Sequence, residues 1–111
     1  MISVSVAFVD DHPMLLEGIR AIFARKPKYK VVATGNCCAE ALDIAIEYGP
    51  DVLLIDLNMP GNAFDCIAQI RRIAPGTRVV AFTASSGINH AIDALQAGAN
   101  GYVLKGSPLG S

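Results

Sequence analysis

The sequence predicts an α/β fold in which helices cover both faces of a parallel sheet. Three observations predict it: β-branched runs alternate with segments of helical period, the connections between them are short, and the strand runs are too apolar to be half-exposed. Alternation of this kind implies right-handed crossovers between parallel strands. At 111 residues the chain can bury one hydrophobic core but not two, and we expect one domain.

The strand runs are rich in valine, isoleucine and leucine. In chain order they are VSVAFV (4–9), KVVAT (30–34), DVLLID (51–56), RVVAFT (78–83) and GYVLK (101–105). Runs this apolar are typical of strands that are buried on both faces. The sequence therefore predicts five strands in the interior of the domain.

Four segments between the strands have the period of an amphipathic helix and stop at proline or glycine. Their apolar faces consist of Leu15, Ile19, Ile22 and Phe23 before Pro27; Ala41, Leu42, Ala45 and Ile46 before Gly49-Pro50; Ile67, Ile70 and Ala74 before Pro75-Gly76; and Ile88, Ala91, Ile92 and Leu95 before Gly98. The predicted order of elements is βαβαβαβαβ.

The composition argues against several classes of protein. The net charge is −1 without a Lys/Arg run, so we expect neither direct nucleic-acid binding nor a membrane surface as partner. No apolar run approaches the ~20 residues of a membrane span, and no basic segment precedes the apolar N-terminus as in a signal peptide. Cys37, Cys38 and Cys66 are odd in number and form no Cys-x-x-Cys motif. They predict incidental thiols in a reduced, cytoplasmic protein.

Five polar residues are expected at one edge of the sheet. In open parallel α/β sheets, ligands bind at the edge where the carboxyl ends of the strands meet. Asp10 and Asp11 follow the first strand, whereas Asp56, Thr83 and Lys105 end the third, fourth and fifth. Two carboxylates 4 Å apart repel by about 4 kcal/mol at an effective dielectric constant of 20. Three carboxylates therefore predict a cation, and their oxygen atoms suit Mg²⁺.

Four motifs, VDDHP, LLIDLNMPG, AFTA and AGANGYVLK, occur in this order along the chain. Together they resemble the receiver domain of two-component response regulators. The segments DDHP and LKGSP are most similar to the subfamily with a C-terminal helix-turn-helix output domain. The resemblance implies a flavodoxin-like, doubly wound, five-stranded parallel sheet with strand order 2-1-3-4-5; the order does not follow from the pattern itself.

The resemblance also implies a role for each acidic residue. Asp56 is similar to the phosphoacceptor, which takes a phosphoryl group from a histidine kinase or a small phosphodonor. Asp10 and Asp11 are similar to the acidic pair that holds Mg²⁺ together with Asp56 and the backbone carbonyl of Asn58. His12 lies beside the pair in sequence, but imidazole suits a magnesium site poorly. An alternative role for Asp11 is capping of the helix that follows.

Further roles are implied for the last strands. Lys105 would pair with the transferred phosphoryl oxygens, and Thr83 and Tyr102 would form the pair that switches the surface of the domain. The activity expected is self-catalysed phosphorylation and autodephosphorylation of the aspartate, not that of a classical enzyme. The partners implied are a histidine kinase and an output domain of the same protein, which is expected to regulate transcription. A homodimer is expected for a separate reason: without a complete fifth helix, an apolar face of the sheet would be left for a second copy to cover.

Residues 1–106 are expected to form the receiver domain. In residues 107–111, Ser107 and Pro108 suit the start of a helix, so this segment is expected to be the cut-short start of a fifth helix or an expression remnant. Two other classes of protein are alternatives to the receiver function. A haloacid dehalogenase type phosphatase needs a second acid where Asn58 stands, and an amide cannot shuttle its proton. A flavodoxin-like electron carrier would place its FMN phosphate where DDHP repels it.

Overall fold

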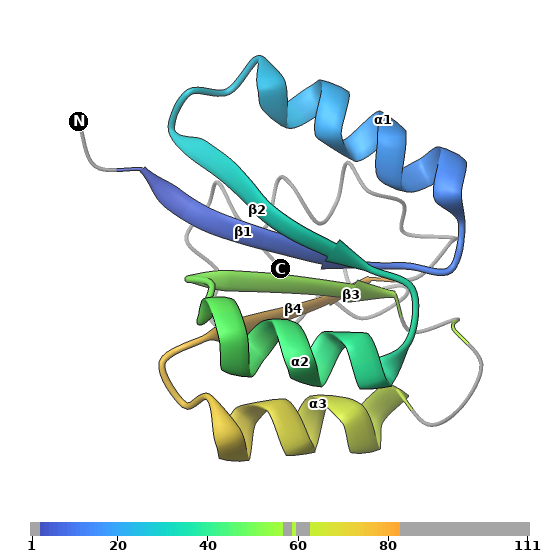
Figure 1. Ribbon diagram of the computed structural model, residues 1–111, viewed down its shortest axis with the longest axis vertical. Coiled ribbons are helices and arrows are strands. Elements are labelled where there is room, and N and C mark those ends of the chain that lie inside the picture. Colours follow the sequence, from blue (N-terminus) through green and yellow to red (C-terminus); the bar gives the residue numbers. More distant parts are fainter. Residues whose placement is uncertain (1–2, 57–58, 60–62, 83–111) are drawn as a thin grey trace, which may run out of the picture.

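The computed structural model describes residues 3–56, 59 and 63–82. In chain order their elements are β1 (Val4–Val9), α1 (Pro13–Ala24), β2 (Tyr29–Gly35), α2 (Cys38–Tyr48), β3 (Val52–Asp56), α3 (Ala63–Ile73) and β4 (Arg78–Phe82). The strands form a parallel sheet in the order β2-β1-β3-β4 (Figure 1). Within the described residues, this arrangement confirms the predicted α/β fold and the order 2-1-3-4.

The predicted strands agree with the observed ones to within one residue at each described end. β1 and β3 are almost entirely buried, as runs without polar alternation should be. The predicted helix around Ile88 and the predicted strand at 101–105 lie outside the described residues. Among those described, no helix combines the length and the apolar character that crossing a bilayer requires.

Alternate side chains of each strand pack against different helices. α1 covers one face of the sheet, and α2 and α3 lie side by side on the other (Figure 1). Along β1, Val6 and Phe8 pack on the α1 face, whereas Ala7 and Val9 pack on the α2 and α3 face. This two-residue alternation gives two apolar layers with one sheet between them. Both layers hold the strand ends in fixed register.

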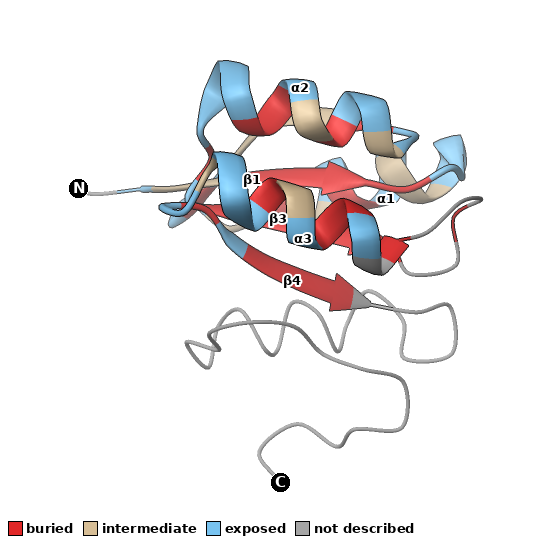
Figure 2. Cartoon of the chain, turned by 90° about the horizontal axis from the view of Figure 1, so that it is seen from below, coloured by how far each residue is buried: buried red, intermediate tan, exposed pale blue. Residues whose placement is uncertain are grey.

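The predicted apolar face of α2 is wrong at Ile46. Ile46 was expected on the buried face, but 70% of it is exposed, whereas Ile44 is buried. Ala41 and Ala45 are buried as predicted. Ile44 lies three residues after Ala41 and shares its face of the helix, whereas Ile46 lies five residues after Ala41 and does not. Figure 2 shows the exposed outer surface of α2 above its buried inner surface.

The amino-terminal edge of the sheet is held by a reciprocal contact. The backbone N–H and the hydroxyl of Ser5 donate to Asp51 Oδ2 at 2.9 and 3.0 Å, and the backbone N–H of Asp51 donates to Ser5 Oγ at 2.8 Å. Between them these bonds join β1 to the residue before β3. They fix the register of two central strands at the edge opposite their carboxyl ends.

Candidate functional site

The carboxyl ends of β1 and β3 bring two buried aspartates together. The sheet order reverses at β1, which pairs with β2 on one side and β3 on the other, and ligands bind in the crevice at such a point. Val9 pairs with Ile55, so the next residues, Asp10 and Asp56, are level with each other. Their exposed fractions are only 1% and 2%. Two carboxylates are thus withdrawn from water at the ligand-binding edge of the sheet.

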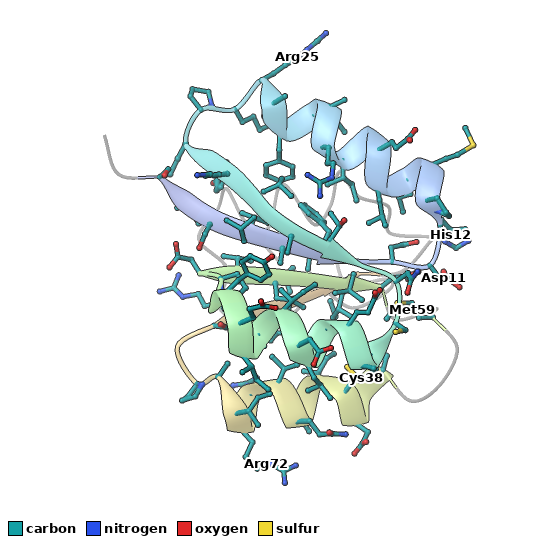
Figure 3. All side chains as sticks on the ribbon, in the orientation of Figure 1. Asp11, His12, Arg25, Cys38, Met59 and Arg72 are labelled. Atoms are coloured by element: carbon teal, nitrogen blue, oxygen red, sulfur yellow. A yellow bond between two sulfur atoms is a disulfide. The ribbon has the colours of Figure 1, made fainter. Side chains whose placement is uncertain are left out.

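Asp11 and His12 complete the cluster from the turn into α1. His12 Nδ1 lies 2.7 Å from Asp10 Oδ1 and 3.0 Å from Asp11 Oδ1. The backbone N–H of His12 also donates to Asp10 Oδ1, at 2.7 Å. One ligand atom from each of Asp10, Asp11, His12 and Asp56 lies within 4.8 Å of the others. Figure 3 shows Asp11 and His12 at this end of the molecule.

The acidic surroundings act on the imidazole. The hydrogen bond with Asp10 raises the pKa of His12 above 6.5, and the negative charges of Asp10 and Asp11 raise it further. His12 is the N-cap of α1, and its side chain makes no capping bond. The alternative role of Asp11 as the cap is therefore wrong. The His12 side chain is free to turn back onto the carboxylates, where its protonated form offsets part of their charge.

One atom of the cluster marks a place for a cation. Asp10 Oδ2 is buried and has no hydrogen-bond partner within the described part of the chain. A buried carboxylate oxygen without a partner costs free energy, and a bound cation would supply the missing interaction. Three carboxylates offer the hard oxygen ligands that Mg²⁺ prefers. The donor set therefore fits a magnesium ion.

Comparison with known families identifies the domain. The sequence model described as "Response regulator receiver domain" matches residues 6–110. The chain belongs to this family. Membership separates this receiver domain from the phosphatase and electron-carrier alternatives that the strand-end aspartate had left open.

Several relatives of the receiver domain are response regulators by name. It is 33% identical to the nitrate/nitrite response regulator protein NarL of Escherichia coli K12, over 91% of this chain and 47% of NarL. Over 92% of this chain and 48% of NarP, it is 36% identical to the nitrate/nitrite response regulator protein NarP of the same strain. The chain thus spans about half the length of these curated relatives.

Solved structures show the same fold. The two-component response regulator of the LuxR family from Aurantimonas sp. SI85-9A1 superposes with a TM-score of 0.73 and 36% identity, covering 94% of this chain and 75% of that one. The signal receiver domain of the putative response regulator NarL from Mycobacterium tuberculosis superposes with a TM-score of 0.73 and 33% identity, covering 97% of this chain and 88% of that one. Both likenesses confirm the flavodoxin-like class.

The structure brings together Asp10, Asp11 and Asp56, as the topology argument expects. Asn58 and the predicted residues of the last two strands, Thr83, Tyr102 and Lys105, lie outside the described residues. Sequence reasoning missed the pairing of His12 with the two aspartates. The signal in the sequence is that His12 directly follows two aspartates, which suggests an ion pair as well as a metal ligand.

The receiver domain also contains a disulfide between Cys38 and Cys66, which corrects the expectation of reduced, incidental thiols. Cys37 remains free and exposed. The sequence did not reveal the pair, because an odd number of cysteines does not indicate which of the adjacent Cys37 and Cys38 would bond to Cys66. Right-handed crossovers place α2 and α3 on the same face, with their first turns at the same edge. The strand order is what brings Cys38 and Cys66 together.

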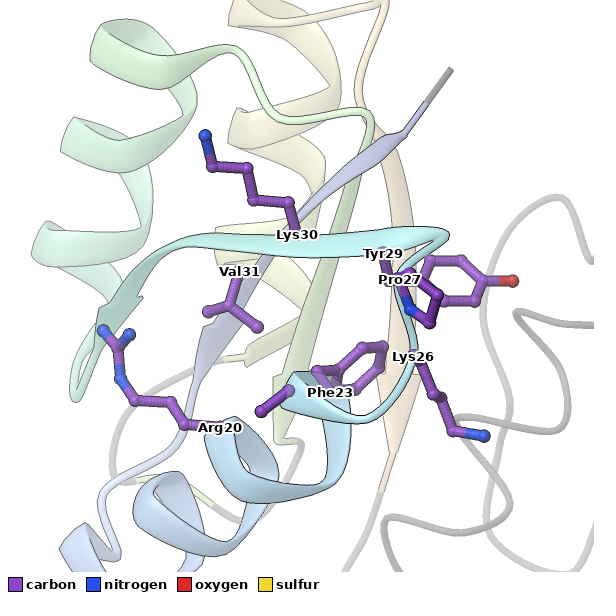
Figure 4. Close-up of a pocket in the computed structure, with 8 residues that line it drawn as sticks. Arg20, Phe23, Lys26, Pro27, Tyr29, Lys30 and Val31 are labelled. Carbon is purple, nitrogen blue, oxygen red and sulfur yellow. The ribbon is translucent and has the colours of Figure 1, made fainter. Parts of the chain in front are cut away.

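A separate hollow of about 250 Å³ is lined by none of the residues of the acidic cluster (Figure 4). It is formed where the end of α1 meets the start of β2, toward the amino ends of the strands. Its lining includes Arg20, Lys26 and Lys30. The hollow is therefore cationic, whereas the cluster at the carboxyl ends is anionic, and the two belong to different sites.

Proposed function

We propose that Asp56 accepts a phosphoryl group from the phosphohistidine of a histidine kinase or from a small acyl phosphate. A carboxylate oxygen of Asp56 attacks phosphorus, the bond from phosphorus to the donor nitrogen or oxygen breaks, and the product is an acyl phosphate on the protein. The observation that carries the proposal is the position of Asp56, buried at the end of β3 with a carboxylate oxygen within 4.8 Å of carboxylate oxygens of Asp10 and Asp11.

Magnesium is the cofactor that this site suits. Asp10, Asp11 and Asp56 would hold the ion, with the backbone carbonyl of Asn58 as a further ligand. When bound, Mg²⁺ offsets the negative charge that gathers on the transferred phosphoryl oxygens. The chain's own part is to hold Asp56 out of bulk water and fixed at the end of a central strand. A buried strand end gives the nucleophile little freedom to move away from the phosphodonor.

Membership in the family supports the remaining roles that we propose. Lys105 pairs with the transferred phosphoryl oxygens, and Thr83 and Tyr102 carry the change of state to the surface. The signal then passes to an output domain that regulates transcription in the full-length protein, which acts in the cytoplasm and pairs with a second copy. This proposal rests on relatives about twice as long as the chain and on a response regulator of known structure, RcsB, solved in complex with DNA.

Intact mass spectrometry tests the proposal. The chain is incubated with acetyl phosphate and Mg²⁺, and the mass of one phosphoryl group should be gained. Asp56→Asn should gain none, because an amide is not a nucleophile toward phosphorus. Asp43→Asn, a change at an exposed position of α2, is the matched control and should be labelled like the unchanged chain. Equal labelling of Asp56→Asn and the unchanged chain would refute the assignment.

A further inference from the structure

The disulfide between Cys38 and Cys66 joins two helices at their first turns. Cys38 is the first residue of α2, and Cys66 lies in the first turn of α3. Their Cα atoms are 5.9 Å apart, a separation at which disulfides ordinarily form. Cys66 is 1% exposed, whereas Cys38 is partly buried. Cys38 is therefore the more exposed of the two bonded cysteines.

The disulfide lies at the edge of the sheet that carries the acidic cluster. Both helices begin there, because each follows a strand whose carboxyl end is at that edge. The chain runs from Asp56 through residues 57–62 directly into α3. Within that connection Met59 is buried in the same apolar cluster as Cys66. Figure 3 shows Met59, Cys38 and Asp11 at one end of the molecule.

We propose that Cys38 and Cys66 are a reversible thiol–disulfide site whose state sets the rate of phosphoryl uptake at Asp56. The disulfide fixes the start of α3 to α2, and so fixes the far end of the connection that follows Asp56. Reduction releases that end and leaves Asp56 held by the pairing of β3 in the sheet and by packing, without the added restraint of the disulfide. The effect on uptake rests on the proposed function, whereas the formation of the disulfide does not.

The exchange partner is a small thiol of the glutathione class. Its thiolate attacks the Sγ of Cys38, the more exposed of the two cysteines. The attack breaks the bond between the two protein sulfurs and forms a mixed disulfide. Cys66 leaves as a thiolate and takes up a proton. A second thiolate attacks the sulfur of the small molecule, releasing Cys38. In balance, two small thiols are oxidised to one small disulfide, and the protein disulfide gains two electrons and two protons.

Counting free thiols tests the site without reference to phosphorylation. The 111-residue chain is equilibrated with mixtures of glutathione and glutathione disulfide, alkylated with a maleimide and weighed intact. We expect one alkyl group at the oxidising end, on Cys37, and three at the reducing end, with the change reversing when the mixture is reversed. Cys37→Ser, the matched control, should give none and two. Three groups at every ratio would overturn the proposal, as would one group that glutathione never changes.

Labelling rates test the effect on the site. Initial rates of labelling by acetyl phosphate with Mg²⁺ are compared between the oxidised and reduced chains, and reduction should slow labelling roughly threefold or more, since small misplacements of reacting groups cost rate steeply. Cys38→Ser should lose the response to reductant, whereas Cys37→Ser should keep it. Equal rates in both forms of the unchanged chain would overturn the effect. Absence of labelling in both forms would refute the proposed function, and the thiol count would still decide the disulfide.

Discussion

His12 Nδ1 lies 2.7 Å from Asp10 Oδ1, within a cluster whose other members are carboxylates. The imidazole contacts Oδ1 of Asp10, whereas the buried Oδ2 has no hydrogen-bond partner among the residues that the structure describes. His12 therefore supplies a hydrogen-bond partner for one of the two carboxylate oxygens of Asp10. The other oxygen is the atom to which a cation would bind.

The His12 pair predicts an elevated pKa that depends on Asp10. The hydrogen bond with Asp10 is the largest cause of the raised pKa, so Asp10→Asn should lower the pKa of His12 toward 6.5. NMR titration in the presence of a chelator, with His90 as the second histidine signal, measures it. Because the folded-state pKa is raised, the stabilisation should be complete below the unfolded-state pKa of about 6.5 and be lost as pH rises through the folded-state value. An unchanged pKa in Asp10→Asn would contradict the pairing.

Magnesium affinity should depend on Asp11 more than on His12. Asp11→Ala removes a carboxylate oxygen, whereas His12→Ala removes an imidazole, which the ion prefers less. We expect the loss in Asp11→Ala to exceed the roughly tenfold loss that follows removal of an outer partner of a metal site. Calorimetric titration of both variants measures the affinities. Since the His12 side chain makes no capping bond, its removal leaves the start of α1 intact. A larger loss in His12→Ala would indicate a transition-metal site instead.

Reduction of the disulfide should lower the free energy of unfolding. Cys38 and Cys66 are 28 residues apart in sequence, and a disulfide closing a loop of that length is expected to stabilise by about 3 to 4 kcal/mol. Denaturant melts with and without reductant measure the difference. Cys37→Ser should show the same difference, because Cys37 does not take part in the bond. Superimposable oxidised and reduced melts would contradict the structure.

Ser5→Ala should weaken the connection between β1 and β3. The Ser5 hydroxyl both donates to Asp51 and accepts from its backbone N–H, so alanine removes two hydrogen bonds at once. Because the contact is exposed, we expect a loss of about 1 kcal/mol in the free energy of unfolding. Ser3→Ala, at an exposed position near the same end of β1, is the control and should change little. A loss equal in both variants would show that the contact is not stabilising.

The strands could be predicted because their burial is two-sided. Runs such as residues 51–56 contain no polar alternation, and only a covered parallel strand accommodates them. The face of α2 was less predictable. Ile46 has the helical spacing of four from Leu42, but the buried residues are Ala41, Ile44 and Ala45, which share a face three and four residues apart. Two overlapping apolar faces were therefore possible, and contact with the sheet selects the one that contains Ile44.

The acidic cluster could be predicted because topology alone places strand ends at one edge. The parallel arrangement places Asp10 and Asp56 at the same edge of the sheet, and the pairing of β1 with β3 brings them level with each other. The disulfide needed more, because its cysteines lie on two helices whose adjacency follows from the strand order. The order came from resemblance and not from the pattern. The direction of the His12 side chain depends on local torsion angles, which cannot be predicted from the spacing of residues.

The position of the phosphoryl group is the most direct test of the site. The chain is labelled with acetyl phosphate and Mg²⁺, the acyl phosphate is reduced with borohydride, which converts the modified aspartate to homoserine, and peptide mass spectrometry locates the change. The buried carboxylate at the end of β3 predicts homoserine at position 56 alone. Homoserine at position 10 or 11 with Asp56 unchanged would contradict the assignment of Asp56 as the nucleophile.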